Sequence, residues 1–491
     1  MKKIIYRVLT VFTLAGSALG LQSCGDWLDI NTNELAATKT EPGYLFNYAA
    51  INYSSKRVGG DQWLPIIYAA QVASDGDNWF YGDDMYNIST YATGNGWVTS
   101  YSSAGYNLLK AIDFAVAGND HNAVAQCKTL LANTVWESSM IYGDIPYSEA
   151  WKIEETQTPH FDAQKDVLYS CIALLDEALG DIDESNSVCI DKYDIYYTGD
   201  MAKWRRLANS LKLKIYLYLA NKEDVASKIG ELVTGNGLMT STADDFIFPF
   251  YTTPGNQNPN YQLVVQYPDY YDYCFFANPT VLDPMKALDD PRLPQYFRPN
   301  ADGEYIGIAS SVKGSVVTDD AVVENPSKCT EAVFNKNNLL RADYPDVICS
   351  YAETMLYVAE VYVRGLGVAK DMAKADEAYR KGIEASCVYN GVDAATAASF
   401  AAGVPSLSTL GGDEQALQAI ASQQRIEMMM RPLEAWSNQR RTGYPALEVP
   451  VAIRNFYPGI MQRWTYPDRE SSVNGNVPYV DGVWVKMWFQ N

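Results

Sequence analysis

Apolar residues recur at intervals of three or four along much of the chain, which is the spacing of one face of an α-helix. One such stripe comprises Trp204, Leu207, Leu211, Ile215 and Tyr218. Asp200 precedes it at a position suited to an N-cap, because its carboxylate can accept a hydrogen bond from an unpaired amide of the first turn. The pattern predicts a mostly α protein and places Trp204 in its core.

Three predicted helix pairs are formed by helices that follow each other closely in the sequence. They span 124–142 with 164–183, 201–220 with 223–235, and the segment 347–387. In the last pair Gly365 and Gly367 interrupt the stripe, and Asp371 can cap the helix that follows. Asp-Met-Ala-Lys occurs at 200–203 and again at 371–374, as two N-caps of one kind or by chance. Helix lengths and small residues predict tetratricopeptide-like helical pairs forming a scaffold, without a strict repeat.

The segment from about 236 to 345 lacks such stripes and is rich in Pro, Gly and Asn. These residues favour turns, so we expect a long loop-rich insertion with little β-structure, in which 305–317 is a candidate strand or hairpin. A long irregular segment inside a compact protein usually carries function. The chain end, 450–491, is also irregular. We therefore expect one helical domain at 43–491 with a ligand-facing insertion.

The first 23 residues have the features of a secretory signal. Lys2, Lys3 and Arg7 precede an apolar stretch that is too short to span a bilayer comfortably. The stretch ends in Leu-Gln-Ser followed by Cys24, which resembles the lipobox of a bacterial lipoprotein, where the cysteine becomes the acylated first residue. The alternatives are an uncleaved anchor and an ordinary signal with a chance cysteine. We expect 1–23 to be a lipoprotein signal peptide, Cys24 to be lipidated and 24–42 to be a tether.

Charge and composition exclude several classes of function. The 491-residue chain has a formal charge of −21, which argues against nucleic acid because phosphate-binding proteins need clustered Lys and Arg. Removal of 1–23 takes away three cations and no acids, which lowers the charge to −24. A hydrophobic share of 47% is that of a globular protein, and no second stretch is apolar enough to cross a membrane. The seven cysteines after Cys24 indicate neither a disulfide framework nor a zinc site, and we expect no metal or other cofactor.

The densest mixture of acids and aromatic rings lies at 75–84, where Trp79, Phe80 and Tyr81 follow each other. Aromatic faces suit the C–H face of a sugar, and Trp and Tyr can also form hydrogen bonds. Packing into the core is the alternative for these three rings. The acids of this loop could bind calcium, but their spacing departs from an EF-hand and its final Glu is missing. A solvated acidic loop is therefore the favoured interpretation.

A second candidate loop carries Tyr270, Tyr271 and Tyr273, with aspartates beside the rings. Stacking surface next to hydroxyl-binding carboxylates is what recognition of a polyol needs. Phe275 and Phe276 follow directly. A loop whose rings fold back on the scaffold is the alternative. The two loops together supply six candidate ligand-binding residues.

Catalytic signatures are missing from the sequence. The two histidines, His121 and His160, lie in polar stretches without a nucleophile, metalloprotease or P-loop motif. A glycosidase with two catalytic carboxylates stays open, since the separation of acids cannot be seen in a sequence. We expect no enzyme.

One constellation of charges has a structural interpretation. Glu353 and Glu360 lie seven residues apart on one predicted helix face, and the pair Arg440-Arg441 offers guanidinium donors. We expect carboxylates and guanidinium groups to pair, because a charge drawn into a core needs a partner. The helical spacing around Trp436 places that ring in the core as well.

Several distinctive strings follow one another along nearly the whole chain. They are Asp-Trp-Leu-Asp-Ile-Asn at 26–31, Tyr-Gly-Asp-Ile-Pro-Tyr-Ser-Glu-Ala at 142–150, Tyr-Thr-Gly-Asp at 197–200, Asp-Asp-Pro-Arg-Leu-Pro at 289–294 and Arg-Arg-Thr-Gly-Tyr-Pro at 440–445. Together they resemble the SusD/RagB family of outer-membrane lipoproteins, and most of all its starch-utilisation-like branch. Asn438 and Gln439 depart from the family pattern. Ligand residues vary between members, so no binding residue carries over by motif.

This resemblance implies a scaffold of tetratricopeptide-like pairs with a loop-rich ligand surface. It also implies a lipid-anchored, surface-exposed outer-membrane protein that binds a nutrient glycan and delivers it to a TonB-dependent, SusC-like transporter barrel. Some members bind peptides, which makes a peptide ligand the alternative. The resemblance implies no catalysis, and contact with the membrane through the lipid anchor only.

Overall fold

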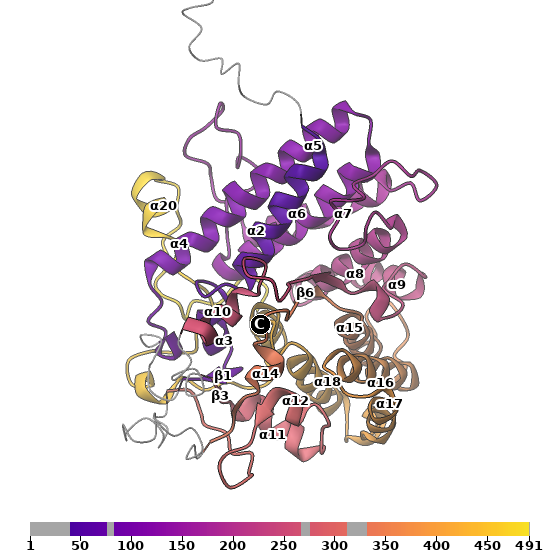
Figure 1. Cartoon of the computed structure of the whole chain (residues 1–491), viewed down its shortest axis with the longest axis vertical. Helices are drawn as coiled ribbons and strands as arrows, with labels where there is room; N and C mark the ends of the chain where they lie inside the picture. The colour runs from indigo at the N-terminus through magenta and orange to yellow at the C-terminus, as the bar shows by residue number, and fades with distance from the viewer. Residues whose placement is uncertain (1–39, 76–82, 267–274, 312–330, 491) are drawn as a thin grey trace, which may run out of the picture. The chain divides into compact units, whose positions relative to one another are not determined.

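The computed structural model describes residues 40–75, 83–266, 275–311 and 331–490. The chain divides into two units, Met1–Glu41 and Pro42–Asn491, and the first lies almost entirely outside the described residues. The second unit contains helices throughout its length (Figure 1).

The first half of this unit is a set of helices, some joined by short turns and others by longer irregular segments such as 143–163 and 182–200. In order they are α2 (Pro42–Arg57), α3 (Trp63–Ala69), the 3-10 turn η1 (Asp83–Met85), α4 (Thr90–Val98), the π-helix η2 (Thr99–Tyr106), α5 (Asn107–Ala117), α6 (His121–Tyr142), α7 (Gln164–Asp181), α8 (Met201–Leu219), α9 (Ala226–Thr234) and the 3-10 turn η3 (Thr242–Asp244). The long helix α6 packs against α5 on one side and α7 on another, and α2 packs against α5 and η2.

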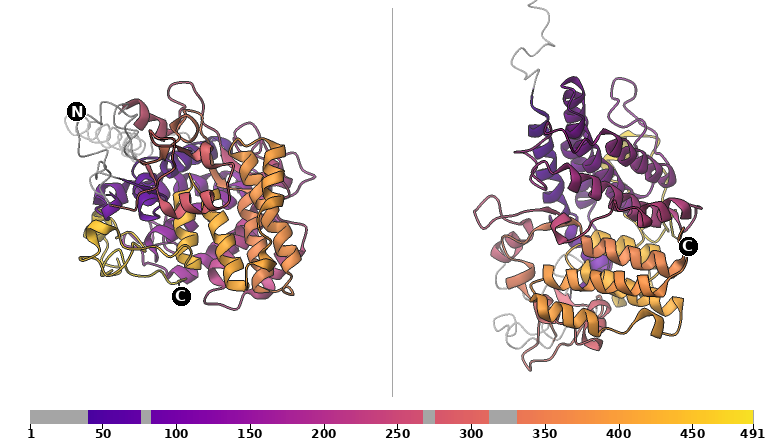
Figure 2. Two further views of the ribbon diagram at one scale, coloured as in Figure 1. Left: turned by 90° about the horizontal axis from the view of Figure 1, so that it is seen from below. Right: turned by 90° about the vertical axis from the view of Figure 1, so that its right-hand side faces the viewer.

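The second half closes with another helical block. Its elements are α15 (Tyr351–Arg364), α16 (Met372–Tyr389), α17 (Ala394–Gly403), the 3-10 turn η7 (Leu407–Thr409), α18 (Asp413–Glu427), α19 (Pro432–Thr442), the 3-10 turn η8 (Val451–Ile453) and α20 (Asp468–Val473). The helix α16 packs between α15 and α17, and Figure 2 shows the orange helices of this block stacked side by side. The chain after α19 is mostly irregular, as the sequence predicts.

Short strands and helices occupy much of the segment predicted as loop. They are β2 (Phe246–Phe248), α10 (Pro259–Gln266), β3 (Phe276–Ala277), α11 (Pro279–Ala287), α12 (Leu293–Tyr296), β4 (Phe297–Arg298), β5 (Val333–Phe334), α14 (Lys336–Leu339) and β6 (Asp346–Cys349). Three of these strands join β1 (Ala73–Ser74) in an antiparallel sheet with the order β1-β3-β5-β4. The strands β2 and β6 form a separate antiparallel pair. Phe276 lies opposite both Ser74 and Val333.

The segment is loop-rich, as predicted, because irregular stretches separate these short elements, but the sequence did not reveal the individual short helices and strands. Strands of two residues are too short to show an alternating pattern, and their partners lie far apart in the chain. The described part of the candidate hairpin, 305–311, contains no strand, although the amide of Ile308 donates to the carbonyl of Ala277 at 3.0 Å. Little β-structure is confirmed.

All three predicted helix pairs are present, as α6 with α7, α8 with α9, and α15 with α16. Asp200 caps α8 by accepting from the amide of Lys203 at 3.2 Å, and Asp371 caps α16 by accepting from Ala373 at 3.0 Å. The repeated motif is thus a pair of N-caps. Gly365 ends α15 with φ of 68°, a left-handed conformation that favours glycine.

The core is rich in large rings. Among the described residues, five tryptophans are almost completely buried: Trp63, Trp136, Trp204, Trp436 and Trp464. The positions predicted for Trp204 and Trp436 are therefore confirmed.

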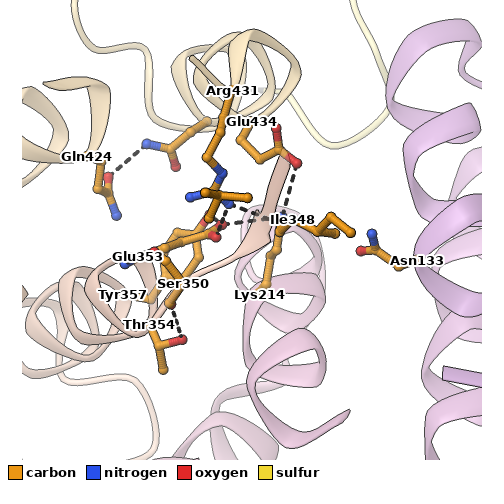
Figure 3. A network of polar contacts seen from close by, with 12 residues as sticks. Asn133, Lys214, Ile348, Ser350, Glu353, Thr354, Tyr357, Gln424, Arg431 and Glu434 are labelled. Atoms are coloured by element: carbon orange, nitrogen blue, oxygen red, sulfur yellow. Dashed lines mark hydrogen bonds and ion pairs between the residues drawn. The ribbon is translucent and has the colours of Figure 1, made fainter. Parts of the chain in front are cut away.

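A buried ionic network joins the two helical blocks. Lys214 of α8 and Arg431, the residue before α19, both pair with Glu353 of α15, and the Lys214–Glu353 distance is 3.3 Å. Lys214 also lies 4.0 Å from Glu434 of α19. Figure 3 shows these four side chains pointing toward one another. Burial by itself raises the pKa of Glu353, but the cations Arg431 and Lys214 outweigh this and hold the pKa below its usual value.

The predicted pairing of acids with the arginine pair is half correct. Arg441 forms two parallel contacts of 2.6 Å with Glu360, and it also donates to Asn438 at 2.7 Å. Arg440 instead lies 3.7 Å from the ring centre of Trp436. Glu353 pairs with Lys214 and Arg431 instead. Lys214 belongs to α8, which packs on α15, and Arg431 follows α18, which also packs on α15.

A second buried cluster surrounds Arg57 at the end of α2. Its guanidinium contacts Asp346 of β6 at 3.1 Å, Glu434 of α19 at 3.0 Å and Glu137 of α6. One cation therefore ties together four elements from the beginning, middle and end of the unit.

Candidate ligand-binding cleft

A large cleft opens between the end of α4 with η2, the segment 146–159 and the region of α20. Its volume is about 880 Å³, which lies in the range of small-molecule binding sites. The helices α4 and α20 are in contact, and Figure 1 shows them beside each other. Of the cavities characterised among the described residues, the others hold about 10 Å³ each.

Four aromatic side chains line the cleft: Trp97, Tyr101, Tyr106 and Trp151. Trp97 and Tyr101 have ring centres 4.8 Å apart, and Tyr101 and Trp151 have ring centres 5.3 Å apart. These three rings form a row in which Trp97 is only 8% exposed, and Tyr106, which is 49% exposed, adds a fourth ring to the lining. Such a row offers successive flat apolar faces with polar atoms at their edges.

The π-helix η2 presents two of these rings. Its hydrogen bonds join residues five apart, so Tyr101 and Tyr106 lie roughly one turn from each other. The hydroxyl of Tyr101 donates to the carbonyl of Pro146 at 2.7 Å, which fixes η2 to the opposite wall. π-helical turns are rare and often occur at functional sites.

Trp151 is held in an unfavourable backbone conformation. Its φ is 61°, and a left-handed backbone at a bulky residue costs roughly 1–3 kcal/mol. Two contacts hold it there. Its indole N–H donates to the carbonyl of Tyr101 at 2.7 Å, and its ring lies against Gly105, where any Cβ would overlap it. The ring is therefore positioned before any ligand arrives.

Charged groups of both signs line the cleft. They are Glu149, Lys152, Asp468, Arg469 and Glu470. Glu149 accepts from the backbone amide of His160 at 2.9 Å and lies 3.0 Å from its ring Nδ1, and these hydrogen bonds lower the pKa of Glu149. Asn474 donates to Glu470 at 3.1 Å and to the carbonyl of Pro159 at 2.9 Å, which joins α20 to the segment 146–159. The lining can bind hydroxyl and amide groups without a dominant charge.

The six ligand-binding residues predicted from sequence lie outside the described residues. They are Trp79, Phe80, Tyr81, Tyr270, Tyr271 and Tyr273, and Cys24 also lies outside. They stay predictions. Phe275 and Phe276, which follow the second loop, are 1% and 0% exposed and belong to the core.

The two ends of the acidic loop are buried in the structure. Asp84 accepts hydrogen bonds from the amides of Asp75 at 3.3 Å and Ser311 at 2.6 Å, so it joins 75–84 to a distant segment. Burial raises the pKa of Asp84 to about 7, and the neighbouring Asp75 adds to this. Within the described residues, no three His, Cys, Asp or Glu side chains are placed to hold a metal ion. Likewise, no described helix is long and apolar enough to cross a membrane.

Sequence reasoning missed the cleft. The string at 142–150 was interpreted only as a family motif, although Trp151 follows it directly. Tyr101 and Tyr106, five residues apart, match neither the helix nor the strand period.

Comparison with known proteins identifies the family. A family model described as "Starch-binding associating with outer membrane" matches residues 32–467. The chain belongs to the SusD-like family. Its members are nutrient-binding proteins associated with the outer membrane. Curated protein sequences gave no significant match to this SusD-like chain.

Solved structures share the fold of this SusD-like protein. A SusD homologue from Bacteroides fragilis NCTC 9343 is 24% identical, with a TM-score of 0.72 over 92% of this chain and 99% of the other. A chitin-binding protein is 21% identical, with a TM-score of 0.74 over 92% of this chain and 100% of the other. A SusD homologue from Parabacteroides distasonis ATCC 8503 is 20% identical, with a TM-score of 0.74 over 91% and 97%. These matches confirm the mostly helical, tetratricopeptide-like scaffold.

Proposed function

We propose that this SusD-like protein binds a nutrient glycan at the cell surface and delivers it to a TonB-dependent transporter. The observation that carries the proposal is the set of aromatic rings in the cleft, where Trp97, Tyr101 and Trp151 form a row and Tyr106 also lines the wall. Pyranose rings stack on such faces, while the polar groups of the lining accept and donate hydrogen bonds to hydroxyls.

The cleft binds its ligand without changing it. A retaining or inverting glycosidase needs two carboxyl groups at a set distance across the scissile bond, one of them a proton donor with a raised pKa. Glu149 in the cleft does not suit the proton donor, because its hydrogen bonds to His160 lower its pKa. The family description, which is of binding, supports the binding role.

The anchor in this proposal is a lipid on Cys24. Signal removal would leave the cysteine as the first residue, joined to α2 through the tether 24–42. Two or more acyl chains on one residue hold a protein stably at a membrane, whereas one chain does not. The partner is a SusC-like barrel in the same membrane.

The two aromatic loops are proposed as further ligand contacts. Trp79 and its neighbours, and Tyr271 and its neighbours, combine rings with acids in the way that polyol recognition requires. They would extend the surface along which a long glycan binds.

Calorimetry with glycans on residues 25–491, after a glycan-array screen, tests this function. We expect Trp151→Ala to weaken glycan binding at least about tenfold, since a buried aromatic contact is a typical hot spot. Tyr479→Ala is the matched control, because Tyr479 is 88% exposed and is not part of the cleft lining. Trp79→Ala and Tyr271→Ala test the loops separately. Binding of peptides with no sugar signal would replace the glycan with the alternative ligand class.

A further inference from the structure

The cleft contains more aliphatic surface than sugar stacking requires. Ile153, Val473 and Val98 line it, and they are 73%, 69% and 41% exposed. Single exposed aliphatic residues are ordinary on protein surfaces. These three come from three different walls, namely the segment 146–159, the end of α20 and the end of α4. Together with the four rings they form an apolar lining that an occupant should cover.

We infer that the cleft selects a glycan built from N-acetylated amino sugars. This inference rests on the proposed function and names its class of ligand. A plain hexose presents C–H faces to rings but only hydroxyl groups at its edges. An N-acetylated sugar adds a methyl group at the edge of each unit, which can pack against an aliphatic side chain while the pyranose face stacks on an aromatic one.

The polar lining suits the remainder of an acetamido group. The amide has one N–H donor and one carbonyl acceptor, and it carries no charge. Gln157 and Asn95 in the lining have side chains with both a donor and an acceptor. Glu149 is kept ionised as an acceptor by His160. A neutral polar group therefore finds partners without leaving a buried charge unpaired.

A peptide fits the cleft less well. Extended peptides are commonly bound by pairing with the edge of a β-sheet. The described walls of the cleft consist of α4, η2, the irregular segment 146–159 and α20, and none of them is a strand. Pairing of this kind has no edge to use here.

Calorimetry on residues 25–491 with three β-1,4-linked pentasaccharides tests the inference. Chitopentaose, cellopentaose and the fully deacetylated glucosamine pentamer share one backbone and differ only at C2. One buried methyl group contributes about fourfold in affinity, so with two or more acetamido groups in the cleft we expect chitopentaose to bind at least about tenfold tighter than cellopentaose. The deacetylated pentamer is cationic, so it measures simple attraction to this acidic protein.

Two variants connect the selectivity to the cleft. The double variant Ile153→Ser with Val473→Ser should bring the chitopentaose-to-cellopentaose ratio to within about threefold of unity. Val188→Ser is the control, because Val188 is 55% exposed and outside the cleft lining. It should leave the ratio unchanged.

The possible failures are distinguishable. The inference is overturned if chitopentaose and cellopentaose bind with equal affinity, or if the deacetylated pentamer binds as tightly as chitopentaose or more tightly. It is also overturned if the double variant keeps the wild-type chitopentaose-to-cellopentaose affinity ratio. If another glycan binds instead and Trp151→Ala abolishes its binding, the inference fails while the proposed function stands. If no glycan binds at all, both fail.

Discussion

Replacement of Arg441 by alanine should remove one of the strongest ionic contacts in the scaffold. The guanidinium forms two contacts of 2.6 Å with Glu360, and both side chains are at most 5% exposed. Truncation leaves a buried carboxylate with Arg364 as its remaining charged partner, 2.8 Å away. Breaking a buried pair by removing one partner typically costs about 3–5 kcal/mol.

The pKa of Glu360 gives an independent magnitude. Burial alone raises this pKa, but Arg441 and Arg364 lower it from 4.5 to about 2. That difference corresponds to about 3 kcal/mol of stability. The pKa is lower in the folded state, so this stability is complete above about pH 4.5 and is lost as the pH falls toward 2. The difference in free energy of unfolding between wild type and Arg441→Ala should therefore shrink as the pH falls from 5 toward 3.

A thermal scan by circular dichroism at pH 7 measures the effect on residues 25–491. For a unit of this size about 1 °C corresponds to 1 kcal/mol, so we expect Arg441→Ala to melt about 3–5 °C below wild type. Arg364→Ala is the matched control, because it touches the same carboxylate from a side chain that is 23% exposed, and it should lower the melting temperature by about 1 °C. Equal melting temperatures for Arg441→Ala and wild type, or equal losses in the two variants, would refute the reasoning.

Three further outcomes are expected. Gly105→Ala should displace the Trp151 ring and weaken glycan binding by about tenfold in calorimetry, because the new methyl group overlaps that ring. Cys24→Ser should abolish incorporation of radioactive palmitate and move the protein from the membrane fraction to the soluble fraction. Asp84→Asn should gain stability over wild type in urea unfolding at pH 8 but not at pH 5. The folded-state pKa of Asp84 is raised to about 7, so wild-type stability falls as the pH rises from 4 to 7.

For each of these three variants a specific result would contradict the expectation. Gly180→Ala is the control for the first, since a Cβ there meets no atom within 4 Å, and equal affinities for the two alanine variants would exclude a positioning role for Gly105. Retention of the serine variant in the membrane fraction would point to another anchor. A stability difference for Asp84→Asn that is the same at both pH values would show that its charge is not the cause.

The helical scaffold could be predicted because the residues that specify each helix lie close together in the sequence. The stripe through Trp204 and the capping aspartates at 200 and 371 each lie within one or two turns, and the structure has them as predicted. The pairing of Glu360 with the pair Arg440-Arg441 was also predicted, although only the structure shows that Arg441 is the partner. The partners of Glu353 were not, because helix packing decides which cations reach it.

The cleft could not be predicted because its walls are far apart in the sequence. Segments 94–106, 146–159 and 467–474 meet only after the helices have packed. The left-handed backbone of Trp151 also has no signature in residue type, since it occurs at a tryptophan and not at a glycine or asparagine. The loops that sequence does single out, with Trp79 and Tyr271, await the binding experiments above.

The cluster around Arg57 has a consequence for the order in which the chain can fold. During synthesis the N-terminal helix α2 is made first, yet Asp346 follows Arg57 by 289 residues and Glu434 comes later still. Until those acids emerge, a folded N-terminal half would enclose this cation without two of its three carboxylates, at a cost of several kcal/mol. The nascent chain therefore has a reason to stay open until its last helices are complete.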